Sequence, residues 1–214
     1  MQVPEWLRFR SRDVISAAIF IGIGVCVRLA LLNLNVPNLE PVMALSLIAG
    51  MVMPLALAAI VPIAMMAVTD FLIYTFRLGG QYGIVPILGI AFFVYTGFVM
   101  ATVVGKALRR RYALKVGNLG VIVFAGVLVT LVWDVWTVFG IWYFLDAANP
   151  ATLATRFEWQ ASFTIIHVAS SLIFIPLFGS GYMLLTEHKA EIPSSAPANE
   201  PGRHSGQVTP DAHP

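Results

Sequence analysis

The chain has 214 residues, of which 58% are hydrophobic and 11% are charged, and its formal net charge is +2. Soluble domains usually carry about 25% charged residues, so this composition excludes a water-soluble domain and predicts an integral membrane protein. Most basic residues ahead of the C-terminal tail gather in two short segments beside apolar runs, a pattern typical of membrane loops and not of a nucleic-acid surface. The single cysteine, Cys26, excludes an internal disulfide.

The first apolar segment, residues 14–32, follows a basic stretch and has the charge pattern of a secretory signal. Its length, the presence of Arg28 and the lack of a small-x-small cleavage site predict instead a retained helix. Three later segments also have about the 20 residues that a spanning helix needs, namely 84–105, 119–144 and 160–185.

Residues 42–74 form an apolar segment that is long for one span and short for two. Proline lacks the N–H of the helical ladder and disfavours helical geometry at the preceding residue. We therefore expect a break at Met53 and Pro54.

Basic residues set the orientation. They lie before the first span, at Arg8, Arg10 and Arg12, and again in residues 106–115, so both segments should be cytoplasmic. An even number of crossings must then separate them, which requires two helices within residues 42–74. The sequence predicts an all-α integral membrane bundle of six transmembrane helices, with helices two and three short. We expect a multi-pass protein of the cell (inner) membrane with both termini cytoplasmic.

The predicted membrane domain covers residues 1–186, and its outer loops are residues 33–41, 77–83 and 145–159. Residues 187–214 are rich in Pro, Ser, Ala and Glu, so we expect a disordered cytoplasmic tail. His188, His204 and His213 in that tail are too scattered to predict a metal site. The sequence predicts no cofactor.

Four ionisable side chains lie within apolar stretches: Arg28, Asp70, Asp134 and His167. From the helical rise, they should lie about 6 to 15 Å below the outer ends of their helices, all in the outer half of the membrane. A charge in hydrocarbon costs at least about 2.5 to 3.5 kcal/mol, so such a layer predicts a binding site open to the outside. The alternative is that Arg28 pairs with Asp70 or Asp134 only to hold helices together.

Polar residues repeat around three of these charges at the spacing of one helical face. Such faces point into a bundle or a wet cavity and not into lipid. The three faces are Asp70, Tyr74 and Arg77; Thr130, Asp134 and Thr137; and Gln160, Thr164, His167 and Ser171.

Residues 133–143 are dense in aromatic side chains. Tryptophans near an outer interface often form only a headgroup belt, and a belt accounts for Trp142 and Tyr143. Trp133 and Trp136 lie deeper, where stacking on a flat organic ligand is an equal alternative.

Small residues recur at every fourth position of the first span, at Ala18, Gly22, Cys26 and Ala30. Such a stripe lets helices approach closely, either within the bundle or at a docking face for another membrane subunit. A similar stripe, Gly97, Ala101 and Gly105, lies in the fourth predicted helix.

Several short motifs agree in order and spacing with one family. They are Arg28 ahead of Val36-Pro37-Asn38-Leu39-Glu40-Pro41, then Ala44-Leu45, Ile48-Ala49-Gly50, Thr69-Asp70 and Thr137-Val138-Phe139-Gly140-Ile141-Trp142. Over about residues 14–185, the chain resembles the substrate-binding S component of energy-coupling-factor vitamin transporters, and most closely a little-characterised group of them. That group has an aromatic residue where this chain has Leu39, and an asparagine where it has Val138. If that asparagine contacts the ligand in the relatives, the ligand here is different.

The resemblance implies a subunit that captures a vitamin-like molecule and passes it to a transmembrane coupling subunit and two ATPases. The chain has no Gly-x-x-x-x-Gly-Lys-Ser/Thr loop, so the resemblance assigns ATP hydrolysis to those partners. Alternatives are a structural or assembly subunit and, with no nucleophile motif to favour it, a membrane enzyme using His167 and Asp134. The candidate substrate-binding residues are Arg28, Asn38, Glu40, Asp70, Tyr74, Trp133, Asp134, Trp136, Thr137, Thr164, His167 and Ser171.

Overall fold

The computed structural model describes residues 9–34, 39–75 and 84–190, with side chains through residue 185. These residues form helices and contain no strand, which confirms the all-α prediction. The helices are α1 (Ser11–Asn33), α2 (Val42–Val52), α3 (Leu55–Ile73), α4 (Ile84–Arg109), α5 (Leu119–Leu145) and α6 (Pro150–Ala190).

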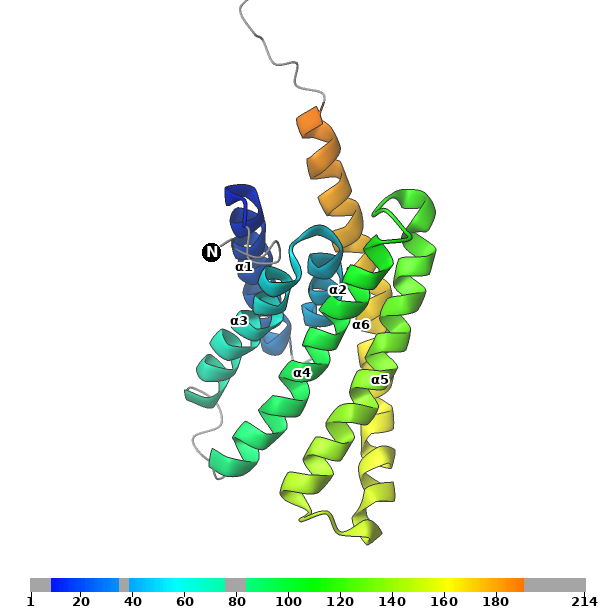
Figure 1. Cartoon of the computed structure of the whole chain (residues 1–214). Coiled ribbons are helices and arrows are strands. Elements are labelled where there is room, and N and C mark those ends of the chain that lie inside the picture. Colours follow the sequence, from blue (N-terminus) through cyan, green and yellow to red (C-terminus); the bar gives the residue numbers. More distant parts are fainter. Residues whose placement is uncertain (1–8, 35–38, 76–83, 191–214) are drawn as a thin grey trace, which may run out of the picture.

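All of these helices except α2 are long and apolar enough to cross a membrane, so the chain is a multi-pass membrane protein. Successive helices run in opposite directions, and the start of α1 and the end of α6 therefore lie at the same end of the bundle (Figure 1). The second and third helices, which the sequence predicted to be short, differ in length. α2 has 11 residues, whereas α3 has 19 and is long enough for a span.

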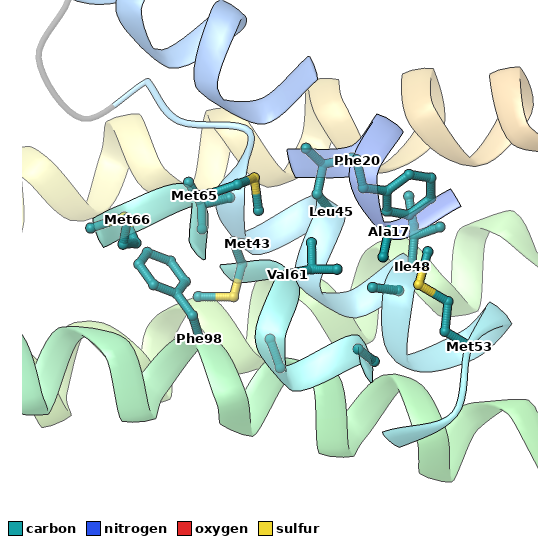
Figure 2. Close-up of a cluster of buried hydrophobic side chains, with 14 of the residues drawn as sticks. Ala17, Phe20, Met43, Leu45, Ile48, Met53, Val61, Met65, Met66 and Phe98 are labelled. Atoms are coloured by element: carbon teal, nitrogen blue, oxygen red, sulfur yellow. The ribbon is translucent and has the colours of Figure 1, made fainter. Parts of the chain in front are cut away.

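The short α2 is the centre of the bundle. Its residues from Val42 to Met51 are all buried, and it contacts α1, α3, α4, α5 and α6. A helix that is apolar on every side must be enclosed by others. Side chains of α2 such as Met43, Leu45 and Ile48 pack in one cluster with Phe20 of α1 and Met65 of α3 (Figure 2).

The break between α2 and α3 lies where proline predicts it. Met53 is extended, with φ −116° and ψ 165°, and Pro54 caps the start of α3. The proline ring excludes the helical conformation at Met53, so the chain turns back there.

Glycines bring the backbones of α2 and α4 into contact. A Cβ on Gly50 would lie 2.1 Å from the Thr102 carbonyl oxygen, and one on Gly105 would lie 2.1 Å from that of Leu47. The predicted stripe of α4 therefore packs inside the bundle. The predicted stripe of α1 does the opposite: Ala18, Gly22, Cys26 and Ala30 are all exposed.

Two boundaries differ from the sequence prediction. The predicted outer loop at residues 145–159 is mostly helical, because α6 begins at Pro150, and α6 continues to Ala190, beyond the predicted domain end at 186. Asn149 Oδ1 accepts the Ala151 amide at 3.1 Å and so caps the start of α6. An asparagine cap followed by proline at the first helical position is a helix-start signal that the hydropathy reading overlooked.

Candidate functional site

Arg28 is the centre of the first polar cluster. It is buried near the end of α1, and its guanidinium donates to Asp70 Oδ1 at 2.9 Å and to Glu40 Oε1 at 3.3 Å. It also contacts the Thr69 hydroxyl. Tyr95 of α4 donates its hydroxyl to the other carboxylate oxygen of Asp70, Oδ2, at 2.9 Å.

These five residues, the Arg28 network, tie α1, α3 and α4 to the segment that enters α2. The network places one guanidinium between two carboxylates, and both oxygens of Asp70 have a donor. A buried charge is tolerated when it is paired and hydrogen-bonded. The network thus pairs its one cation with both carboxylates and keeps a formal charge of −1.

Asp134 of α5 and His167 of α6 form a second cluster. His167 Nδ1 lies 2.6 Å from Asp134 Oδ1, which also accepts a hydrogen bond from Gln160 Nε2 at 2.8 Å. The two residues are only 3% and 7% exposed. Nevertheless, Asp134 Oδ2 and His167 Nε2 are buried without any hydrogen-bond partner.

Those two atoms are unusual. The great majority of buried polar atoms in native proteins are hydrogen-bonded, and leaving one unsatisfied costs about 1 to 3 kcal/mol. Because Nδ1 faces the carboxylate, the other ring nitrogen, Nε2, is an acceptor when the imidazole is neutral and a donor when it is protonated. The Asp134–His167 pair can therefore offer hydrogen bonds to a further group.

A small cavity separates the Arg28 network from the Asp134–His167 pair. Its volume is about 10 Å³, which is room for about one water molecule. The Glu40 amide donates to Ser170 Oγ at 3.0 Å beside it. The cavity is lined by Glu40, Met43, Phe98, Thr130, Trp133, His167 and Ser170.

The two candidate tryptophans have different surroundings. Trp133 is buried, stacks on Phe98 with ring centroids 4.8 Å apart, and presents an edge contact to His167. Trp136 does not line the cavity; it is 36% exposed and donates to Thr96 Oγ1 at 3.0 Å. Of the two tryptophans, therefore, only Trp133 lines the cavity, together with Phe98.

A second hollow reaches Asp134 from the outer surface of the α5–α6 pair. It has a volume of about 340 Å³ and includes Gln160 and Thr164 among its lining residues. Leu131 and Phe157, which also line it, are exposed. The Asp134–His167 pair thus lies between the small cavity and this lateral groove.

The remaining candidates have mixed positions. Thr137 is buried, but its hydroxyl donates to the Asp134 carbonyl of its own helix at 2.9 Å. Ser171 pairs with Thr130 at 2.7 Å and joins α5 to α6. Tyr74 is half-buried at the end of α3. Asn38 and Arg77 lie outside the described residues.

Several contributors were absent from the candidate substrate-binding residues: Met43, Thr69, Tyr95, Phe98, Thr130, Gln160 and Ser170, of which Thr130 and Gln160 had been named only as members of polar helix faces. Thr69 adjoins Asp70, and Ser170 adjoins Ser171, so both could have been predicted from their position next to a candidate residue. Tyr95 and Phe98 lie in a run of aromatic and apolar residues that gives no sign of which side chains face inward. Their role follows only from the packing of α4.

An ion pair joins α6 to the turn that follows α5. Arg156 donates from Nε to Asp146 Oδ2 at 2.7 Å and from a terminal nitrogen to Oδ1 at 2.6 Å. These hydrogen bonds hold the pKa of the Asp146 carboxyl below its usual value. In the part of the chain that the structure describes, no group of three or more His, Cys, Asp or Glu side chains could hold a metal ion.

Comparison with known proteins gives a family but no function. Residues 9–195 match a family of unknown function, DUF6580, and the chain belongs to that family. No curated protein and no solved structure matches the chain significantly.

Proposed function

We propose that this DUF6580 member is a membrane-embedded substrate-binding subunit that captures a vitamin-like small molecule for ATP-driven uptake. The transporter would be of the energy-coupling-factor type. The observation that carries the proposal is the unpaired hydrogen-bonding capacity of Asp134 Oδ2 and His167 Nε2 in a buried site. A ligand that forms hydrogen bonds with both atoms would offset the free-energy cost of burying them unsatisfied.

Charge and shape favour a particular ligand chemistry. Arg28 faces two carboxylates, Glu40 and Asp70, so the Arg28 network carries a formal charge of −1. The Asp134–His167 pair adds −1 when the imidazole is neutral and nothing when it is protonated. With Trp133 as an aromatic wall, the site suits a flat molecule that bears amino groups or a positive charge.

Binding requires the site to open, because the cavity of about 10 Å³ is far below the roughly 300 Å³ of a small-ligand pocket. The lateral groove of about 340 Å³ lies on the other side of the Asp134–His167 pair. A separation of α5 and α6 at this level would join the two hollows. The proposed entry path therefore runs between these helices.

Partners would dock on α1. Its stripe of Ala18, Gly22, Cys26 and Ala30 is exposed, and no atom lies within 4 Å of a Cβ built on Gly22. Exposed small residues permit a second membrane helix to approach closely. This supports a transmembrane coupling subunit as the partner, with ATPases supplied by the same complex and both termini of this chain on their cytoplasmic side.

A structural or assembly subunit is the second candidate, and the completeness of the Arg28 network favours it. There Arg28 bonds both carboxylates, Tyr95 bonds the second oxygen of Asp70, and these contacts fasten α1, α3 and α4 to the segment before α2. A purely structural role does not explain why Asp134 Oδ2 and His167 Nε2 are buried without hydrogen-bond partners.

Mass spectrometry of small molecules released after purification in mild detergent tests the proposal. We expect one compound bearing amino groups to co-purify with the natural chain and to be lost from His167→Gln and Asp134→Asn. Ser46→Ala is the matched control, since Ser46 is equally buried but bonds only to its own helix. Absence of any compound, or equal retention by all variants, would favour the structural subunit.

Docking is tested with Gly22→Leu. We expect unchanged thermal stability and ligand retention but loss of cellular uptake of the compound identified above. Gly120→Leu is the control, because a Cβ on Gly120 also meets no atom within 4 Å. Equal uptake by both variants would exclude α1 as the docking face.

A further inference from the structure

The largest hollow among those described is unrelated to the polar layer. It has a volume of about 980 Å³ and lies at the end of the bundle where α1 begins, α2 turns into α3, and α4 ends. We name it the basic groove. Its lining residues are Phe9, Arg10, Arg12, Asp13, Val52, Pro54, Leu55, Lys106, Arg109 and Arg110.

The charge of the basic groove is strongly one-sided, with five basic side chains and one acidic side chain. The acid, Asp13, is already engaged, since Oδ2 accepts the Arg10 amide at 3.2 Å and Oδ1 lies 3.7 Å from Arg12 Nε. Within the described residues, Lys106, Arg109 and Arg110 form no ion pair with an acid. The groove therefore has a net positive charge that nothing in the described chain neutralises.

Backbone groups add to this field. α3 starts at Leu55 without a side-chain cap, and Pro54 and Leu55 line the groove, so the groove lies at the N-terminus of this helix. The first amides of a helix and the positive end of its dipole favour an anion. The basic side chains place positive charge beside the start of α3, and the two features together form a candidate anion site.

Topology alone does not account for this arrangement. The positive-inside rule requires basic residues near the membrane, but it does not require residues from two distant segments to converge on one hollow. Arg111 and Lys115 belong to the same basic segment and do not line the groove. The convergence of Arg10 and Arg12 with Lys106, Arg109 and Arg110 is a property of the fold.

The apolar surroundings indicate what kind of anion fits. Phe9, Val52 and Leu55 line the groove beside the charges. Farther along two of the same helices, large apolar side chains are exposed one turn from a lining residue, namely Ile15 after Arg12 on α1 and Val103 before Lys106 on α4. A charged headgroup site continued by apolar helix faces matches an amphipathic lipid.

We propose that the basic groove binds the phosphate-bearing headgroup of an anionic phospholipid in the leaflet at this end of the bundle. Arg109, Arg110 and Lys106 contact the phosphate together with the first amides of α3, and the acyl chains lie along the exposed apolar faces. An acidic segment of another protein is the competing occupant, but it would not need the adjoining apolar track.

The test uses the full chain, purified in neutral detergent and stripped of lipid. Binding of phosphatidylglycerol, phosphatidylcholine and water-soluble glycerol phosphate is followed by native mass spectrometry and by the shift in melting temperature. We expect saturable binding of phosphatidylglycerol at one site, at least about tenfold weaker binding of phosphatidylcholine, and weaker binding of glycerol phosphate, which lacks acyl chains.

Arg109→Gln with Arg110→Gln should weaken phosphatidylglycerol binding roughly tenfold or more, because two groove charges are lost. Arg111→Gln with Lys115→Gln removes the same charge from the same segment outside the groove and should change binding less than about twofold. Melting temperatures of the lipid-free variants verify that both fold.

Equal weakening by the two double variants would overturn the proposal, since it would indicate only diffuse attraction. Equal binding of phosphatidylcholine would overturn it too, and so would equal binding of glycerol phosphate, which would indicate a free-anion site. Displacement of the lipid by an acidic peptide with higher affinity in the natural chain would favour a protein occupant.

Discussion

The Arg28 network and the Asp134–His167 pair lie on opposite sides of one small cavity, yet they differ in how they satisfy their charges. In the network, the Arg28 guanidinium bonds two carboxylates, and Tyr95 donates a hydrogen bond to the second oxygen of Asp70. In the pair, one oxygen of Asp134 and one nitrogen of His167 remain without a partner. The carboxylates of the network are half-buried, with side chains 19% and 22% exposed, yet it is the more deeply buried pair that lacks hydrogen-bond partners.

The difference follows from the helices that carry each cluster. The Arg28 network ties α1, α3 and α4 to the segment that enters α2, and glycines hold α2 and α4 together at backbone distance. The pair bridges α5 and α6, which extend beyond the rest of the bundle in Figure 1. We infer that the network stabilises the fold, whereas the pair is the part of the site that a ligand would complete.

The largest expected effect is that of Arg28→Met. It leaves Glu40 and Asp70 without their shared cation, and breaking a buried ion pair in this way costs about 3 to 5 kcal/mol. The free energy of unfolding in detergent measures the loss. The triple variant Arg28→Met, Glu40→Gln and Asp70→Asn removes all three charges and should regain most of the stability. If the triple variant is as unstable as the single one, packing and not charge pairing explains the effect.

Gly50→Ala should have the next largest effect, because its Cβ would collide with the Thr102 carbonyl oxygen at 2.1 Å. Forcing α2 and α4 apart should cost about 1 to 3 kcal/mol of unfolding free energy. Gly22→Ala is the control, since that position is open and alanine favours helix by up to about 1 kcal/mol. Equal stability of the two variants would argue against a locked α2.

Asp134→Asn should affect stability less than Arg28→Met does. It weakens one charged hydrogen bond to His167, for a loss of about 1 to 2 kcal/mol in unfolding free energy. Affinity for the co-purified compound should fall at least about tenfold. Calorimetric titration and thermal melting of the same sample compare the two effects. A variant with full affinity and a large loss of stability would reverse the contrast between the two clusters.

The smallest expected effect concerns Asp146 at the C-terminal end of α5. Its pKa is lowered by Arg156, so the carboxylate contributes stability above its usual pKa, near pH 4, and that contribution is lost as the pH falls through the lowered pKa. The melting temperature of the natural chain should therefore fall more than that of Asp146→Asn between about pH 5 and pH 3. Glu158→Gln, at an exposed acid of the same end, should leave the pH profile unchanged. Parallel profiles for the natural chain and Asp146→Asn would contradict the role of this ion pair.

The sequence by itself determined the class of protein and most of the helices. Its apolar runs are long, and proline has a strict backbone requirement, so the spans and the break at Met53 and Pro54 could be predicted from local chemistry. Burial of Arg28, Asp134 and His167 followed in the same way, because charge is too costly in lipid to be placed there at random. The start of α6 was also encoded, in Asn149 and Pro150, although hydropathy did not reveal it.

Only the tertiary structure decided which polar residues meet. Helical periodicity gives the face of a side chain but not the helix opposite it, so Arg28 could have paired with Asp70 or Asp134 on sequence grounds. The packing of α1 against α3 selected Asp70, and Tyr95 and Glu40 then completed the network. The same limit applied to the small-residue stripes, which have one pattern in sequence but opposite burial. Contacts between helices depend on the mutual fit of whole surfaces, and no local run of residues contains that information.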